Sequence, residues 1–185
     1  MPDTQPIRVP SSSQRVAAPP RRLPKPADPC ALVIFGAGGD LTKRLVVPAL
    51  YNLARTGVLP DNFALIGVNH GAVTTDQWRD SLFDMLKTFV GNAGAEFDVD
   101  RIDQAAWKKL ADRMIALNGD FTEPELYDKI GKALAEAEKV HGTKGNAIFY
   151  LAVADRFFGT VVDQLGKAGL SQPGDGKNGK PAFWR

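Results

Sequence analysis

The sequence predicts an α/β fold, a doubly wound parallel sheet, on two observations. Three short apolar runs with almost no polar alternation are typical of strands buried on both faces: residues 31–36, 63–68 and 147–153. Amphipathic stretches with a helical period separate these runs, as in a chain that alternates strand and helix. At 185 residues, 44% hydrophobic and 24% charged, the chain is long enough for one domain with an ordinary core.

The remaining elements follow from caps, breakers and periodicity. Helices are predicted over residues 41–56, 76–90, 103–111, 123–140 and 156–168, a weaker strand over 114–117, and loops over 91–100 and 171–183. The first helix has an apolar stripe and a bend at Pro48, which removes one backbone hydrogen bond; the stripe is Leu41, Leu45, Leu50 and Leu53. Thr75 and Thr122 are the predicted N-caps of the second and fourth helices.

The N-terminal segment differs in composition from the rest of the chain. Residues 1–29 contain eight of the 13 prolines, which no amphipathic targeting helix tolerates, so we expect a disordered leader and a folded domain over residues 30–185. Five cationic and two acidic residues lie in that leader, so the remaining residues carry a net charge of −1 although the whole chain carries +2. A general nucleic-acid surface is therefore not expected.

Two further composition features restrict the class of protein. No apolar stretch approaches the roughly 20 residues that cross a bilayer, so no membrane association is expected. The single cysteine, Cys30, excludes an internal disulfide framework and is compatible with a reducing compartment, which leads us to expect a cytoplasmic protein. We interpret Cys30 as a small core hydrophobe, and we identify no metal-ligand cluster.

A glycine-rich turn joins the first strand to the first helix. Such a turn directs several backbone N–H groups at one spot, where the helix dipole adds partial positive charge, and this favours phosphate. In the G-x-G-x-x-G spacing, Gly36 and Gly38 match but Leu41 stands at the third place; in G-x-x-G-x-x-G, Gly39 matches and Thr42 does not. Spacing alone leaves dinucleotide binding, another phosphate ligand and a structural turn open.

Three charged residues lie beside this turn: Asp40, Lys43 and Arg44. Asp40 is repulsive to a pyrophosphate, so we expect it to cap the helix by accepting backbone N–H bonds. Lys43 and Arg44 would offset its charge. The second strand ends at Asn69 and His70, where a carboxylate would favour a free ribose 2′-hydroxyl and a cation a 2′-phosphate. With neither a carboxylate nor an arginine there, the coenzyme preference stays open.

Several segments in this order resemble glucose-6-phosphate dehydrogenase. They are FGAGGDLTKRLVVPALYNL, GVLPDNFALIGVNH, NGDFTEPELYDKI and FYLAVADRFFGTVVDQLGKAGL, and the resemblance covers residues 31–185. It implies a Rossmann-like coenzyme domain, incomplete relative to the family. It also implies an enzyme that oxidises glucose 6-phosphate at C1 with NADP, with NAD accepted by some members. A homo-oligomeric full-length protein is implied as well, in the pentose phosphate pathway.

The resemblance assigns the coenzyme-binding residues by position. The turn residues are Gly36, Ala37, Gly38, Gly39, Asp40 and Leu41, joined by Lys43. His70 falls at the ribose, and Val153 and Ala154 fall near the nicotinamide. Three positions depart from the family pattern: Leu45 replaces a lysine, His70 replaces the arginine that holds the 2′-phosphate, and Asp155 replaces a proline.

The catalytic part of the family pattern is missing. The Glu-Lys-Pro-Phe-Gly strand and the Arg-Ile-Asp-His segment with the catalytic histidine do not occur, and residues 101–104 imitate only the start of the latter. Neither His70 nor His141 is placed to act as the base, so we expect an inactive, truncated coenzyme domain. Two alternatives are a natural non-catalytic dinucleotide-binding module and a remnant that neither binds nor catalyses.

Overall fold

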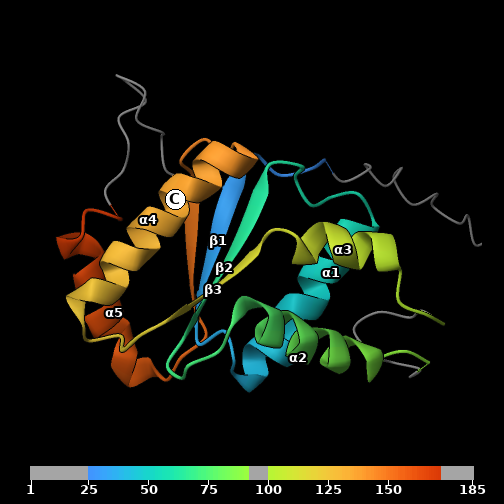
Figure 1. Cartoon of the computed structure of the whole chain (residues 1–185), viewed down its shortest axis with the longest axis horizontal. Coiled ribbons are helices and arrows are strands. Elements are labelled where there is room, and N and C mark those ends of the chain that lie inside the picture. The colour runs from blue at the N-terminus through green and yellow to red at the C-terminus, as the bar shows by residue number, and fades with distance from the viewer. Residues whose placement is uncertain (1–24, 92–99, 172–185) are drawn as a thin grey trace, which may run out of the picture.

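The computed structural model describes residues 25–91 and 100–171 and confirms the predicted fold class. A four-stranded parallel sheet has the order β3-β2-β1-β4. Its strands are β1 (Cys30–Phe35), β2 (Phe63–Asn69), β3 (Met114–Asn118) and β4 (Ala147–Leu151). Helices cover both faces of the sheet, α1, α2 and α3 on one and α4 and α5 on the other (Figure 1).

The helices agree with the expected ranges to within a few residues. They are the π-helical turn η1 (Thr42–Val46), α1 (Val47–Arg55), α2 (Thr75–Lys87), α3 (Gln104–Ala111), α4 (Pro124–His141), the 3₁₀ turn η2 (Asp155–Phe157) and α5 (Phe158–Lys167). The expected leader over residues 1–29 and the loop over 171–183 lie mostly outside the described residues, as does most of the loop over 91–100.

The direction in which successive strands are added to the sheet reverses once. From β1 the chain moves outward through β2 to β3, and it then crosses to the other side of β1 for β4. In a doubly wound sheet, ligands bind at the carboxyl ends of the strands where the order reverses. Here that point lies between Phe35, at the end of β1, and Ala152, whose N–H donates to the Phe35 carbonyl at 2.9 Å. The glycine turn begins at this point.

Two apolar cores lie on the two faces of the sheet. One packs β1 and β2 against α1, α2 and α3, and the other packs them against α4 and α5. The expectation that β4 is buried on both faces is wrong. Ile148 and Tyr150 keep 48% and 39% of their surface exposed, because β4 is an edge strand covered on one face only.

The apolar stripe predicted for the first helix is also wrong in part. Leu50 is buried, but Leu41, Leu45 and Leu53 are 39–48% exposed. The residues that face the sheet are Val47, Pro48, Leu50, Tyr51 and Ala54. Pro48 has no N–H to donate and its ring crowds the preceding turn. The Val47 N–H therefore bonds five residues back, to Thr42, and the wider turn η1 changes the phase of the helix.

Both predicted N-caps are displaced by one residue. Thr74 caps α2, because its hydroxyl accepts the Gln77 N–H while the Gln77 side chain accepts the Thr74 N–H. The Thr75 hydroxyl instead accepts a hydrogen bond of 3.0 Å from the Ala116 N–H of strand β3. At α4 the N-cap position is Glu123, which makes no side-chain cap bond, and the Thr122 hydroxyl donates to Asp120.

Candidate functional site

The turn after β1 requires glycine at Gly36. Its φ of +84° is in the left-handed region, and an added Cβ would lie 2.3 Å from the Ala152 carbonyl oxygen. The Gly36 carbonyl accepts the Gly39 N–H at 2.9 Å and the buried Thr42 hydroxyl at 3.1 Å. These bonds close the turn and begin the helix immediately after it.

The turn leaves a set of backbone donors without partners. The Gly36 and Ala37 N–H groups both donate to the Val68 carbonyl at the end of β2. Within residues 25–91 and 100–171, no hydrogen-bond acceptor is found for the N–H groups of Gly38, Asp40 and Leu41. They lie at the amino end of the helix, where the macrodipole favours negative charge. The arrangement suits a phosphate group.

Asp40 does not cap the helix as expected. Its side chain is 76% exposed and accepts a hydrogen bond from Arg44 Nε at 2.6 Å, one helical turn later. In the described part of the chain, Arg44 is the donor to its carboxylate and no backbone N–H takes that role. Arg44 does offset its charge, whereas Lys43 makes no ion pair in the part of the chain that the structure describes.

A cleft of about 570 Å³ brings most of the expected site residues together. The sequence predicted six residues that line it: Gly36, Gly38, Gly39, His70, Val153 and Ala154. Three do not line it: Ala37 is fully buried behind the turn, and Asp40 and Leu41 are exposed on the first turn of the helix. Lys43 lines a neighbouring cavity.

The end of β2 presents two side chains of opposite character. Asn69 is only 4% exposed, and its carboxamide lies beside Gly38, where an added Cβ would be 3.0 Å from its Oδ1. The His70 side chain is 73% exposed, with Nε2 3.7 Å from the Asp120 carboxylate and the ring edge-on to Phe121. The pKa of Asp120 lies below its usual range, mainly because it accepts two hydrogen bonds from Thr122, with a smaller contribution from His70.

Sequence reasoning missed a contact that supports the turn. The Trp78 indole N–H on α2 donates to the Ala37 carbonyl at 3.0 Å, and the indole ring lies against Gly67 of β2. Arg156 and Phe157 also line the cleft, with the Arg156 guanidinium 4.9 Å from the Phe157 ring. Their position just after the β4 end was the available signal.

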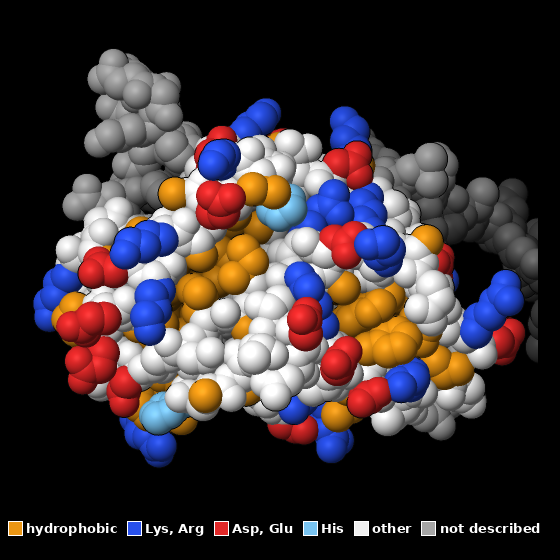
Figure 2. Space-filling model, in the orientation of Figure 1, with side chains coloured by type: hydrophobic (Ala, Val, Ile, Leu, Met, Phe, Trp, Pro, Cys, Tyr) orange, Lys and Arg blue, Asp and Glu red, His pale blue; other side chains and the backbone are white. Residues whose placement is uncertain are grey.

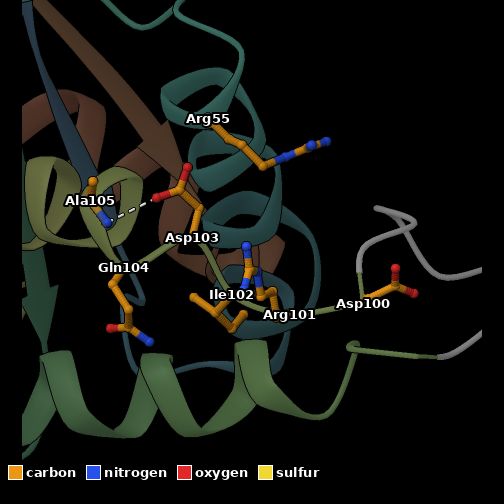
Figure 3. Close-up of a pocket in the computed structure, with 7 residues that line it drawn as sticks. All are labelled: Arg55, Asp100, Arg101, Ile102, Asp103, Gln104 and Ala105. Atoms are coloured by element: carbon orange, nitrogen blue, oxygen red, sulfur yellow. Dashed lines mark hydrogen bonds between the residues drawn. The ribbon is translucent and has the colours of Figure 1, made fainter.

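A larger cavity than the glycine cleft lies at the far end of α1. It measures about 680 Å³ and is lined by Arg55, Asp100, Arg101, Ile102, Asp103, Gln104 and Ala105 (Figure 3). The Asp103 carboxylate turns toward the start of α3 and accepts the Ala105 and Ala106 N–H groups. Asp103 is therefore the N-cap of α3, and residues 101–104 line a cavity other than the glycine cleft.

Two further observations concern the charges on the surface and the residues that could bind a metal or cross a membrane. On the face in Figure 2, Lys and Arg side chains are interspersed with Asp and Glu. In the described ranges, no group of three metal-ligating side chains comes together, and no helix combines the length and apolar character that a bilayer crossing requires.

Fold and turn together place the chain in the class of Rossmann-like α/β domains. A family model described as "Glucose-6-phosphate dehydrogenase, NAD binding domain" matches residues 33–179. Glucose-6-phosphate 1-dehydrogenase 2 of Mycobacterium tuberculosis (strain ATCC 25618 / H37Rv) is 35% identical over 153 residues, which cover 83% of this chain and 28% of that protein. The enzyme of Leuconostoc mesenteroides is 32% identical over 75% of this chain and 26% of its own length.

Solved structures agree with this result. The glucose-6-phosphate 1-dehydrogenase of Mycobacterium avium matches 80% of this chain with a TM-score of 0.63 and 31% identity, over 28% of its own chain. A glucose-6-phosphate dehydrogenase in complex with its substrate glucose-6-phosphate matches 78% with a TM-score of 0.65 and 26% identity, also over 28% of its own chain. The chain belongs to the glucose-6-phosphate dehydrogenase family, within its NAD-binding domain, and spans about 28% of the length of these relatives.

Proposed function

We propose that this chain is the coenzyme-binding domain of an NADP-dependent glucose-6-phosphate dehydrogenase and that the glycine turn holds the coenzyme diphosphate. The proposal depends on the N–H groups of Gly38, Asp40 and Leu41, which have no acceptor among residues 25–91 and 100–171. They lie at a helix amino end beside the switch point of the sheet.

The residues around the turn support one orientation of the coenzyme in the cleft. Gly36 and Gly38 line the cleft, and a Cβ at either position would approach a protein neighbour to 3.0 Å or less, so glycine keeps the turn closely packed at the cleft wall. The end of β2 would face the adenosine ribose, and Val153 and Ala154 the nicotinamide half. When bound, NADP accepts the hydride that leaves C1 of glucose 6-phosphate. The domain's part is to bind and orient that acceptor.

The rest of the reaction belongs to the whole protein. Glucose 6-phosphate as substrate, a homo-oligomeric state and a cytoplasmic location are part of this proposal. His141 ends α4, at the amino edge of the sheet, and so lies away from the cleft where a base is needed. We therefore expect this chain to bind coenzyme but to show no turnover with glucose 6-phosphate on its own.

The test compares two glycine variants in a fluorescence titration with NADPH. Gly38→Ala adds a methyl group at the wall of the cleft, 3.0 Å from Asn69 Oδ1, and we expect the affinity to fall at least about tenfold. Gly159→Ala on α5 is the control, because Gly159 lines neither this cleft nor the neighbouring cavity, its Cβ meets nothing within 4 Å and its φ is not left-handed. Unfolding curves of both variants exclude a loss of fold. Equal NADPH affinity for Gly38→Ala and Gly159→Ala would refute the assignment of the turn.

A further inference from the structure

A second cavity lies on the other side of Asn69 from the glycine cleft. It measures about 400 Å³, and its lining includes Gly38, Lys43, Asn69, Val73, Gln77 and Ser81. Gly38, Asn69 and Val73 also line the glycine cleft, so the two cavities adjoin at the end of β2. No Asp or Glu side chain is among its described lining residues.

The buried carboxamide of Asn69 points to a polar ligand at this place. Its Nδ2 is inaccessible to water and has no hydrogen-bond partner among the described residues. Buried polar groups in proteins are almost always paired, so an orphaned amide at a cavity wall is a feature that a ligand or a rotated side chain must satisfy. A half-turn of the carboxamide would present its donor to the space beside Gly38. Asn69 can thus donate to an anion there.

Lys43 supplies the charge for this cavity. It is half-buried on η1 and forms no ion pair in residues 25–91 and 100–171, whereas its neighbour Arg44 is bound to Asp40. Gln77 adds a side-chain amide, since only its Oε1 is engaged, by the Thr74 N–H. A cation and two amides around a cavity without carboxylates form a setting for a phosphate group.

His70 is in a less favourable place for the same group. Its Nε2 lies 3.7 Å from the Asp120 carboxylate, and a phosphate dianion next to His70 would be repelled by that carboxylate. His70 lines only the glycine cleft, not the cavity of Lys43. A ribose 2′-phosphate at the end of β2 is therefore more favourably placed in the cavity lined by Lys43 than beside His70 and Asp120.

We propose that Lys43, assisted by Asn69 and Gln77, binds the ribose 2′-phosphate of the coenzyme, and that Lys43 rather than His70 sets the preference for NADP over NAD. The inference rests on the proposed coenzyme function and deepens it. The cavity lined by Lys43 differs from the cleft proposed to hold the diphosphate. The assignment of the 2′-phosphate can therefore be wrong while that of the diphosphate is right.

The experiment titrates the 185-residue chain and three variants with 2′,5′-ADP, 5′-ADP, NADPH and NADH in a calorimeter. Lys43→Gln removes one charge-assisted contact, so we expect the affinity for 2′,5′-ADP and NADPH to fall roughly tenfold or more while that for 5′-ADP and NADH changes less than about twofold. Arg44→Gln, the matched control one residue later, leaves the ratio of the NADPH to the NADH affinity within about twofold, because Arg44 offsets the Asp40 charge for ligands with and without a 2′-phosphate alike. His70→Gln changes NADPH and NADH by the same factor.

Three results would overturn the proposal. Lys43→Gln could weaken NADPH and NADH equally, Arg44→Gln could lower the NADPH affinity relative to the NADH affinity as strongly as Lys43→Gln, or His70→Gln could weaken only the ligands with a 2′-phosphate. In each of these cases the coenzyme function would still stand, provided that the wild-type chain binds NADPH or NADH. A wild-type chain that binds neither NADPH nor NADH would refute the coenzyme function as well.

Discussion

Gly67 is the position at which the packing behind the glycine turn can be tested most sharply. A Cβ added there would lie 2.3 Å and 2.5 Å from two carbons of the Trp78 ring and 2.8 Å from the Ala37 Cβ. Carbon atoms in contact are normally about 3.5–4.0 Å apart, so the ring must move by roughly 1 Å. Trp78 is 1% exposed and is held by a hydrogen bond to the Ala37 carbonyl, which we expect to be lost when the ring moves.

The magnitude for Gly67→Ala follows from these two effects. Overpacking costs about 1–3 kcal/mol, and losing a buried hydrogen bond costs about 0.5–1.5 kcal/mol more. We therefore expect the free energy of unfolding to fall by about 2–4 kcal/mol, equivalent to a Tm decrease of roughly 4–16 °C for a domain of this size. Urea unfolding followed by circular dichroism measures the change. Gly71→Ala, in open space, is the control and is expected to change it by less than about 0.5 kcal/mol.

A double variant separates a clash with Trp78 from a general intolerance of the strand. Trp78→Phe removes the part of the indole that would meet the new methyl group, so Gly67→Ala should cost less in that background than in the wild type. The expected coupling is about 1 kcal/mol or more. Additive effects of the two substitutions, or a Gly67→Ala variant as stable as Gly71→Ala, would refute the reasoning.

Two further predictions concern the elements that carry the cleft. Burial raises the pKa of Tyr127 to about 12, with a smaller effect of Asp120, so its phenol stabilises the fold fully below pH 10 and loses that contribution as pH rises through about 12. Ultraviolet titration should show one tyrosine that ionises near pH 12, and Tyr127→Phe should abolish that step; an unchanged titration would contradict the assignment. Thr74→Ala breaks the reciprocal cap with Gln77 and should lower the free energy of unfolding by about 1 kcal/mol in urea titrations. A decrease of only one or two tenths of a kcal/mol in the free energy of unfolding would mean that Thr74 does not cap α2.

The sequence was most informative where local chemistry determines the structure. The apolar runs that became β1 and β2 are buried on both faces, and Gly36 has the left-handed φ that only glycine adopts easily. The displaced caps show the limit of such reasoning. Thr74 and Thr75 are equivalent as residue types, and only the return bond from Gln77 decides between them.

What depends on distant contacts was not predictable from the sequence. An apolar run does not reveal whether its strand lies at an edge, so the exposed Ile148 and Tyr150 of β4 were unexpected. The bond from Trp78 to Ala37 joins residues 41 positions apart. Asn69 was recognised as a hydrogen-bonding residue, but its burial and its orphaned amide follow from the packing of Gly38 against the end of β2.

The most direct test of the central claim is a titration of the isotope-labelled chain with NADP, followed by nitrogen–proton correlation NMR spectra. We expect the largest and saturable shifts at the backbone amides of Gly38, Asp40 and Leu41, which have no partner among the described residues. Shifts centred instead on Ile102–Ala105, at the larger cavity beyond α1, or no shifts at all, would contradict it.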